Sequence, residues 1–144
     1  MQAPLALVSI LLLSGCATGP DPVNNVVHSI APNALAGEWT VERIEDSLVE
    51  DLGTIYLGFE TDGTLTGDTG VNRLLGTWSL EGDSLTFRDL STTRRVGPPH
   101  RMKLEAQLIT TLQSVTRAIQ RGEGNIELFS QDSVLLLIAS PRSN

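Results

Sequence analysis

The sequence predicts an α+β domain: an antiparallel, partly open β-barrel-like sheet with one amphipathic helix packed against it. Short segments that alternate polar and apolar residues follow one another between Glu38 and Arg88. A longer segment, from Arg101 to Arg121, carries apolar residues at helical spacing, and two more strand-like segments follow it. Strands, one helix and two further strands are typical of an α+β domain or of a partly open barrel.

The predicted strands form hairpins. Residues 38–44 alternate so that Trp39, Val41 and Arg43 share one face, which leaves Ile44 to a register shift or bulge. Residues 54–59 and 64–66 are joined by Asp62-Gly63, a strong hairpin signal because the turn needs positive φ. We expect two more hairpins, from residues 75–80 and 84–88 around Glu81-Gly82-Asp83, and from residues 125–129 and 133–139 around Gln131-Asp132.

The predicted helix covers residues 101–121. Pro98 and Pro99 precede it, and Gly122 can supply the left-handed residue at its end. Two basic residues would lie at the negative end of its dipole, Arg117 and Arg121. Its apolar stripe consists of Leu104, Leu108, Leu112, Val115 and Ile119. Such a stripe most often faces a core, so we expect it to cover the sheet.

The N-terminal segment is typical of an export signal. Residues 5–13 form an apolar run that ends in small residues, and it is too short to span a bilayer, which takes roughly 20 apolar residues. No Lys or Arg precedes this run, a departure from the signal pattern. Residues 17–34 are rich in Pro, Gly and Asn, as in a flexible tether. We therefore predict a signal peptide at 1–16, a tether at 17–34 and one domain at 35–140.

Leu13-Ser14-Gly15-Cys16 resembles the lipobox of bacterial lipoproteins. The resemblance implies that Cys16 carries a thioether-linked lipid with acyl chains such as palmitate, which explains why the chain has a single cysteine. Ala17 after the cysteine is similar to the outer-membrane sorting pattern. We therefore expect a protein anchored in the outer membrane through lipidated Cys16 and facing the periplasm.

Charge is unevenly distributed along the chain. The net charge of −7 argues against a nucleic-acid partner, because neutralising phosphates needs a concentrated basic surface. The basic residues nevertheless gather around the start of the predicted helix, at Arg94, Arg95, Arg101 and Lys103. These four residues either pair with the acidic half of the chain or form a docking patch for an acidic partner or lipid headgroups.

No catalytic pattern is recognisable. Beyond the tether the domain has one histidine, His100, and neither a Gly-x-Ser-x-Gly motif nor a zinc pattern accompanies it. The glycine-rich stretch around Gly70 lacks a phosphate-loop signature, and the spacing of Asp62, Asp68 and Asn72 matches no calcium loop. We expect a protein that is not an enzyme and has no metal or cofactor.

The domain resembles the META domain family of the HslJ type. The likeness lies in the order of several short pieces: Leu35-Ala36-Gly37-Glu38-Trp39, Ile55-Tyr56-Leu57-Gly58-Phe59, the stretch from Gly63 to Trp78, Leu85-Thr86-Phe87, Thr92-Thr93-Arg94-Arg95 and Glu105. Among the motif residues we expect Trp39, Gly70, Asn72 and Gly76 to be structural, with Asn72 bonding to main chain in a tight turn. The resemblance places two family cysteines at Val71 and Gly97, so any disulfide or thiol chemistry that relatives perform with them cannot operate in this chain.

Three functions remain open. By resemblance, the protein is an interaction or envelope-stress module. A partly open barrel with a helix against it can also enclose a small apolar ligand or lipid. As a third alternative, the protein inhibits an envelope-attacking hydrolase through an exposed loop, for which residues 91–101 are the candidate segment.

Overall fold

The computed structural model describes residues 27–50, 54–122 and 124–143. The predicted signal peptide, Cys16 and residues 17–26 lie outside the described residues. No helix in the described part of the chain is long and apolar enough to cross a membrane.

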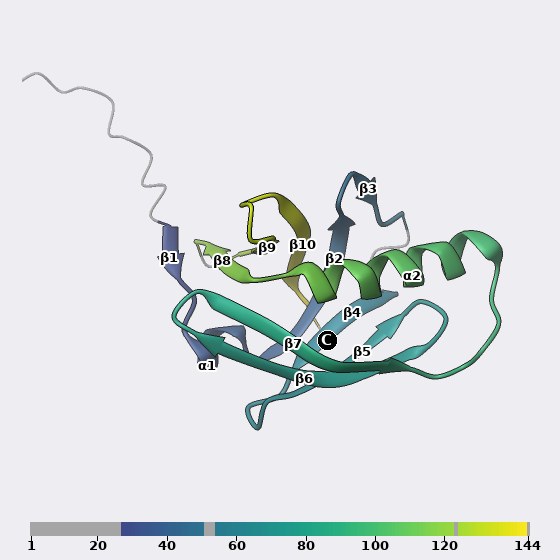
Figure 1. The fold of residues 1–144 in the computed structure, drawn as a ribbon, viewed down its shortest axis with the longest axis horizontal. Helices are drawn as coiled ribbons and strands as arrows, with labels where there is room; N and C mark the ends of the chain where they lie inside the picture. The colour runs from purple at the N-terminus through teal and green to yellow at the C-terminus, as the bar shows by residue number, and fades with distance from the viewer. Residues whose placement is uncertain (1–26, 51–53, 123, 144) are drawn as a thin grey trace, which may run out of the picture.

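Most of the described chain forms one antiparallel sheet, and a long helix crosses it (Figure 1). The elements in chain order are β1 (Val27–Ser29), α1 (Pro32–Leu35), β2 (Gly37–Ile44), β3 (Ser47–Leu48), β4 (Ile55–Phe59), β5 (Thr64–Thr69), β6 (Arg73–Glu81), β7 (Ser84–Thr92), α2 (Pro99–Ser114), β8 (Arg117–Arg121), β9 (Ile126–Phe129) and β10 (Leu135–Pro141). The predicted hairpins are confirmed at Gly63 and Gly82, which both have positive φ.

The strands close into an irregular ring. The pairing order runs β8-β7-β6-β5-β4-β2-β10-β9 and returns to β8, while β1 is added to β8 and β3 to β2. The contact between β7 and β8 is a single residue pair, Ser84 with Arg117, so the ring is nearly open at this point. Helix α2 packs against β7, β2 and β5. The predicted α+β class, with a partly open barrel-like sheet and one packed helix, is confirmed.

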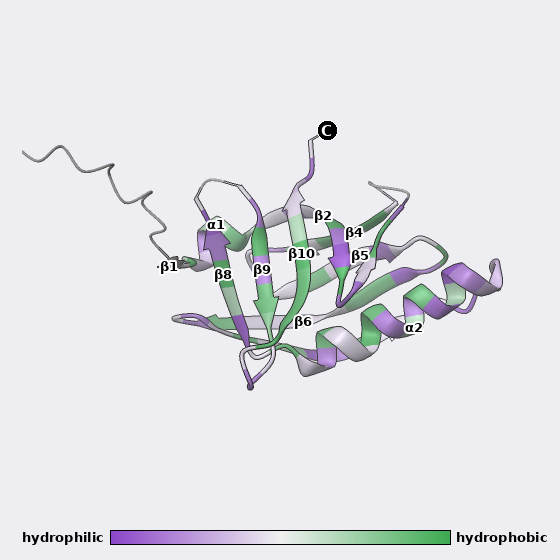
Figure 2. Cartoon of the chain, turned by 90° about the horizontal axis from the view of Figure 1, so that it is seen from above, coloured by the Kyte–Doolittle hydropathy of each residue, from purple (hydrophilic) through white to green (hydrophobic). Residues whose placement is uncertain are grey.

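Apolar side chains from every wall of the ring fill its interior. Trp39, Val41 and Ile44 of β2 are buried, and Phe59 makes an edge-on contact with the Trp78 ring at 5.4 Å between centroids. Ile44 is buried and Arg43 is exposed, because Glu42 is an extra residue between the pairs Val41–Ala139 and Arg43–Ile138; this is the bulge that the sequence predicted. In Figure 2 hydrophobic segments run along β9 and β10, and hydrophobic and hydrophilic residues alternate along α2.

The long helix is shorter than predicted. It begins at Pro99 and ends at Ser114, and residues 117–121 form strand β8 instead of a last helical turn. Val115 is already extended, with φ −69° and ψ 133°. Val115, Thr116 and Ile119 are β-branched, which favours strand over helix, and β8 hydrogen-bonds to both β1 and β9. Val115 and Ile119 are buried as expected, but they lie beyond the end of the helix.

The predicted tether is also partly wrong. Residues 27–29 form β1, which pairs with residues 119–121 of β8. Ile30 and Leu35 are buried in the core, and Pro32 starts the short helix α1. These two apolar side chains give the segment enough buried surface to fold against the ring. Among the described residues, the fold therefore includes the segment from Val27, which lies before the predicted boundary at residue 35.

Candidate functional site

The turn between β5 and β6 is held by its own polar groups. Gly70 has φ +84°, a conformation that favours glycine, and its N–H donates to Asp68 Oδ1 at 2.7 Å. The Asn72 N–H donates to Thr69 Oγ1 at 2.9 Å, and the Thr69 N–H donates to the Asn72 carbonyl at 2.8 Å. This geometry turns the Asn72 side chain away from its own turn and toward a different segment.

Asn72 is 2% exposed, and its side chain has no hydrogen-bonding capacity left. Its Oδ1 accepts from the Arg95 N–H at 2.7 Å and from Thr93 Oγ1 at 2.8 Å. Its Nδ2 donates to the Arg95 carbonyl at 3.2 Å and to the Glu105 carboxylate at 3.0 Å. An asparagine amide has two donor hydrogens and two acceptor lone pairs, so every one of them is used by the protein.

Glu105 connects this turn to the helix. Its side chain, 8% exposed, projects from the second turn of α2 and accepts hydrogen bonds from Asn72 Nδ2 and from the Thr69 hydroxyl. Burying a carboxylate is costly unless hydrogen bonds compensate it, and these neutral donors supply them. We call Thr69, Asn72, Thr93 and Glu105 the polar cluster. The sequence singled out Asn72 and, through the family resemblance, Glu105, but it did not predict that Thr69 and Glu105 would contact the Asn72 side chain.

The polar cluster pins an irregular segment, residues 93–98, which we call the 93–98 loop. Both backbone polar groups of Arg95 bond to Asn72, and the Thr93 N–H donates to the Arg73 carbonyl at 3.1 Å. At Gly97 a Cβ atom would lie 2.8 Å from Val71 Cγ1, so the loop backbone packs directly on the turn. The two positions that the resemblance assigned to family cysteines are therefore neighbours in space.

The predicted basic residues lie on this loop and on the adjoining start of α2. Arg94 and Arg95 are exposed on the loop, and Lys103 is exposed on the helix. Arg101 is half-buried, and its Nη1 donates to the Gly70 carbonyl at 3.4 Å. Within the described ranges Arg94, Arg95 and Lys103 form no ion pair; the pairs seen there join Arg121 to Glu127 and Arg142 to Glu38. Among the described residues, pairing with acidic side chains therefore does not account for these three charges.

Trp39 and Gly76 lie outside the polar cluster. Trp39 is buried in β2, and its indole N–H donates to the Leu35 carbonyl at 2.8 Å. Gly76 lies within β6, where a Cβ would come 2.8 Å from Leu90 Cδ2 and 3.0 Å from the Arg88 carbonyl. The sequence placed Gly76 in a crowded turn; the structure puts it in a strand, where β7 leaves no room for a side chain.

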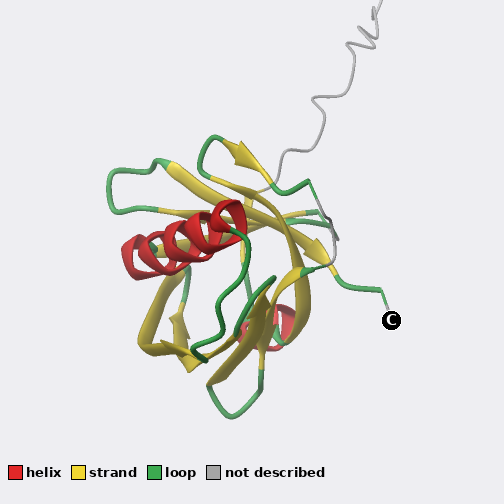
Figure 3. Ribbon diagram, turned by 90° about the vertical axis from the view of Figure 1, so that its right-hand side faces the viewer, coloured by secondary structure: helices red, strands yellow, loops and turns green. Residues whose placement is uncertain are grey.

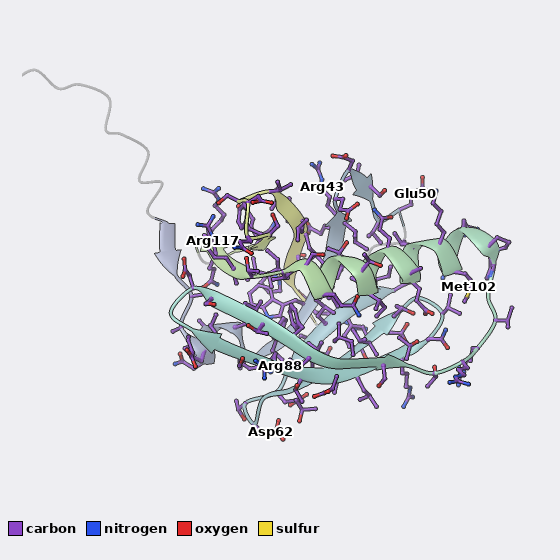
Figure 4. All side chains as sticks on the ribbon, viewed as in Figure 1. Arg43, Glu50, Asp62, Arg88, Met102 and Arg117 are labelled. Atoms are coloured by element: carbon purple, nitrogen blue, oxygen red, sulfur yellow. The ribbon has the colours of Figure 1, made fainter. Side chains whose placement is uncertain are left out.

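A groove of about 780 Å³ runs between α2 and the hairpin of β2 and β3. Its apolar lining comes from Leu48, Val49, Ile55 and Leu104. Glu45 and Glu50 lie on the hairpin side, and His100 and Lys103 lie on the helix side. Figure 4 labels Glu50 on the β3 side of the helix and Met102 at the end of α2 next to the 93–98 loop.

Chemically reactive groups are sparse in the part of the chain that the structure describes. No group of three or more His, Cys, Asp and Glu side chains is close enough there to hold a metal ion. His100 is exposed at the start of α2. The pKa of Asp62 is lowered, because its carboxylate accepts the Thr64 N–H at 2.8 Å in the hairpin turn. That carboxylate serves to hold a turn.

Fold and site together define a small β-ring domain in which a polar cluster ties a turn, a loop and one helix together. The chain belongs to the META domain family, whose model matches residues 33–141. A solved structure of a protein from Burkholderia xenovorans is similar at 20% identity and a TM-score of 0.65, covering 98% of this chain and 100% of that one.

Two other solved structures share the fold. One protein is 16% identical with a TM-score of 0.60, over 77% of this chain and 94% of its own. A DUF4847 family protein from Bacteroides vulgatus ATCC 8482 is 14% identical with a TM-score of 0.53, over 76% of this chain and 95% of its own. No curated protein matches the chain in sequence. These likenesses establish the fold alone.

Proposed function

We propose that the protein is a lipoprotein anchored in the outer membrane through Cys16, and that its META domain faces the periplasm as a non-catalytic interaction or envelope-stress module. The lipobox-like sequence before Cys16 supports the anchor. The non-catalytic part of the proposal is supported by Asn72, whose side-chain donors and acceptors are all used in hydrogen bonds within the protein.

Three members of the polar cluster, Thr69, Asn72 and Glu105, are buried, and the hydrogen-bonding groups of the Asn72 side chain are all used internally. A catalytic site needs a group that is free to take a proton or attack a substrate. Asn72 and Glu105 instead hold the turn, the loop and the helix together. Such an arrangement suits a rigid surface for recognition.

The anchor is tested with a Cys16→Ser chain in cells of the source organism. We expect the wild-type chain to fractionate with outer membranes and its N-terminal peptide to carry the mass of a diacylglycerol thioether. The Cys16→Ser chain should lose both properties. A wild-type N-terminal peptide without lipid would refute the anchor.

The non-catalytic role is tested by complementation. A strain that lacks the gene is grown under heat or antibiotic stress and supplied with the wild-type or the His100→Ala chain. We expect equal rescue by both, because His100 is an exposed residue at the start of α2. Loss of rescue with His100→Ala at equal protein abundance would indicate an enzyme.

The groove between α2 and the β2–β3 hairpin supports a second candidate function, binding of a small apolar ligand or lipid. Its volume of about 780 Å³ falls within the usual range for ligand sites. Native mass spectrometry of the purified chain tests it, with Leu104→Glu as the variant that places a charge in the groove. A stoichiometric adduct that disappears in Leu104→Glu would support this function, whereas an adduct-free wild-type spectrum would count against it.

A further inference from the structure

We propose that the 93–98 loop is a preorganised recognition element that inserts Arg94, Arg95 and Val96 into an acidic cleft of another envelope protein. The inference rests on the proposed function for the compartment and for the role as an interaction module. It adds the surface that makes the contact and the chemistry of the partner.

The 93–98 loop exposes an apolar side chain, that of Val96. Its side chain is 95% exposed, against 67% for Leu48 and 57% for Val134, which are also exposed large apolar residues of the described chain. A single exposed apolar side chain is ordinary on a protein surface. Val96 differs because it lies at the tip of a loop whose backbone is fixed on either side.

Hydrogen bonds and packing fix the backbone of the 93–98 loop. Asn72 holds both backbone groups of Arg95, Gly97 packs on Val71, and Pro98 and Pro99 restrict the backbone that follows. A loop that is already ordered loses little conformational entropy when it binds, so more of its contact energy becomes affinity. The polar cluster therefore does more than stabilise the fold: it fixes the backbone that carries the exposed side chains of Arg94, Arg95 and Val96.

The positive charge of the loop indicates that the partner's surface is acidic. The guanidinium groups of Arg94 and Arg95 have no acidic partner within the described ranges, and exposed Lys103 follows on α2. The whole chain has a net charge of −7, so its other faces repel an acidic protein. Attraction at one end and repulsion elsewhere select a single docking orientation. The cleft that fits is lined by carboxylates and has an apolar floor for Val96.

The position of the loop favours a protein over the anchoring membrane. In Figure 1 strand β1 lies at one end of the domain, whereas the segment between β7 and α2 lies at the other; Figure 3, viewed from that second end, shows this loop beside the helix in the foreground. Residues 17–26 separate Cys16 from β1, ten residues that reach at most about 36 Å. A chain tethered through β1 can stand with the 93–98 loop facing away from the lipid.

The experiment places a photoreactive benzoylphenylalanine at position 96 of the full chain and, in a matched chain, at position 134. Intact cells of the source organism are irradiated, and the captured peptides are sequenced by mass spectrometry. We expect one dominant protein adduct at position 96 that is absent at position 134, with Asp and Glu around the captured site. Adding Arg94→Ala and Arg95→Ala should lower its yield at least about tenfold, because opposite charges steer and hold the docking.

Three results would overturn the inference: equal adducts at positions 96 and 134, a position-96 adduct unaffected by loss of both arginines, or capture of phospholipid in place of protein. Thermal unfolding of each variant checks that the fold is retained. The Cys16→Ser chain separates this inference from the proposed function. If the anchor is refuted but the charge-dependent adduct persists, the proposed membrane anchoring is wrong and the recognition role of the loop stands.

Discussion

Asn72 is the residue on which the candidate site depends. Its amide joins the β5–β6 turn, the 93–98 loop and α2, although these segments are 23 and 33 residues apart in sequence from Asn72. Sequence reasoning indicated a structural asparagine bonding to main chain in a glycine-rich turn. It could not indicate which main chain, because the partners are set by the closure of the ring and not by local spacing.

Replacing Asn72 by alanine should lower the free energy of unfolding by roughly 2–4 kcal/mol, because the buried Glu105 carboxylate and the Arg95 N–H both lose a partner. Chemical denaturation followed by tryptophan fluorescence measures this loss. Asn125→Ala is the matched control, since Asn125 is half-buried and makes one 3.4 Å bond to Glu42. Equal effects of the two changes would contradict the role given to Asn72.

Asp62 gives the hairpin of β4 and β5 a dependence on pH. Its pKa in the folded chain lies below the ordinary value of 3.8, so its stabilising effect is present above that value and is lost as the pH falls through the folded pKa. An Asp62→Ala chain should therefore melt earlier than wild type near neutral pH, and the gap should narrow in acid. Melting curves followed by circular dichroism test this; a gap that stays constant with pH would count against it.

At the scale of the elements, sequence periodicity located the strands well and one helix boundary poorly. Alternation predicted Trp39 and Val41 inward, and Asp62-Gly63 predicted a turn, because both signals are local. The apolar stripe suggested a helix to Arg121, since Val115 and Ile119 continue its spacing. Both are buried in the core, but in an extended segment. Their β-branched side chains, and that of Thr116, favour a strand, and β1 and β9 offer backbone groups with which this strand pairs.

Helix α2 begins without an acidic residue in its first turn and without a side-chain cap. His100 lies at the positive end of the helix dipole, where a negative side chain is preferred. We expect His100→Glu to raise the melting temperature by roughly 1–5 °C. Gln113→Glu, an exposed change at the other end of α2, should lower it by a similar amount, and a rise in both would contradict the dipole argument.

At the scale of the whole molecule, a ring of strands with one weak seam is held together by contacts distant in sequence. Strands β7 and β8 share a single residue pair, while α2 bridges β7, β2 and β5 across the ring. The sequence predicted a partly open barrel with a packed helix, but not which strands would meet at the opening. The N-terminal strand and Ile30 were missed because a Pro- and Asn-rich segment resembles a tether.

The contact between Val71 and Gly97 can be tested with a cross-link. A Cβ built at Gly97 lies 3.5 Å from Val71 Cβ, within the usual disulfide range of about 3.5–4.5 Å. A Val71→Cys, Gly97→Cys chain that also carries Cys16→Ser should form a disulfide on oxidation and gain roughly 3 kcal/mol of stability. Thiol titration and mass spectrometry detect the bond, with Val71→Cys, Cys16→Ser as the single-thiol control. Free thiols in the oxidised double variant would contradict the neighbouring positions.

Hydrogen exchange at the Arg95 amide tests most directly whether the polar cluster holds the 93–98 loop in place. In the wild-type chain this amide donates to Asn72 Oδ1 at 2.7 Å, so it should exchange slowly although it lies in an exposed loop. In Asn72→Ala it should exchange at least about tenfold faster, while the amides between β4 and β5 keep their protection. An Arg95 amide that exchanges at the rate of an unprotected chain in the wild type would contradict the account.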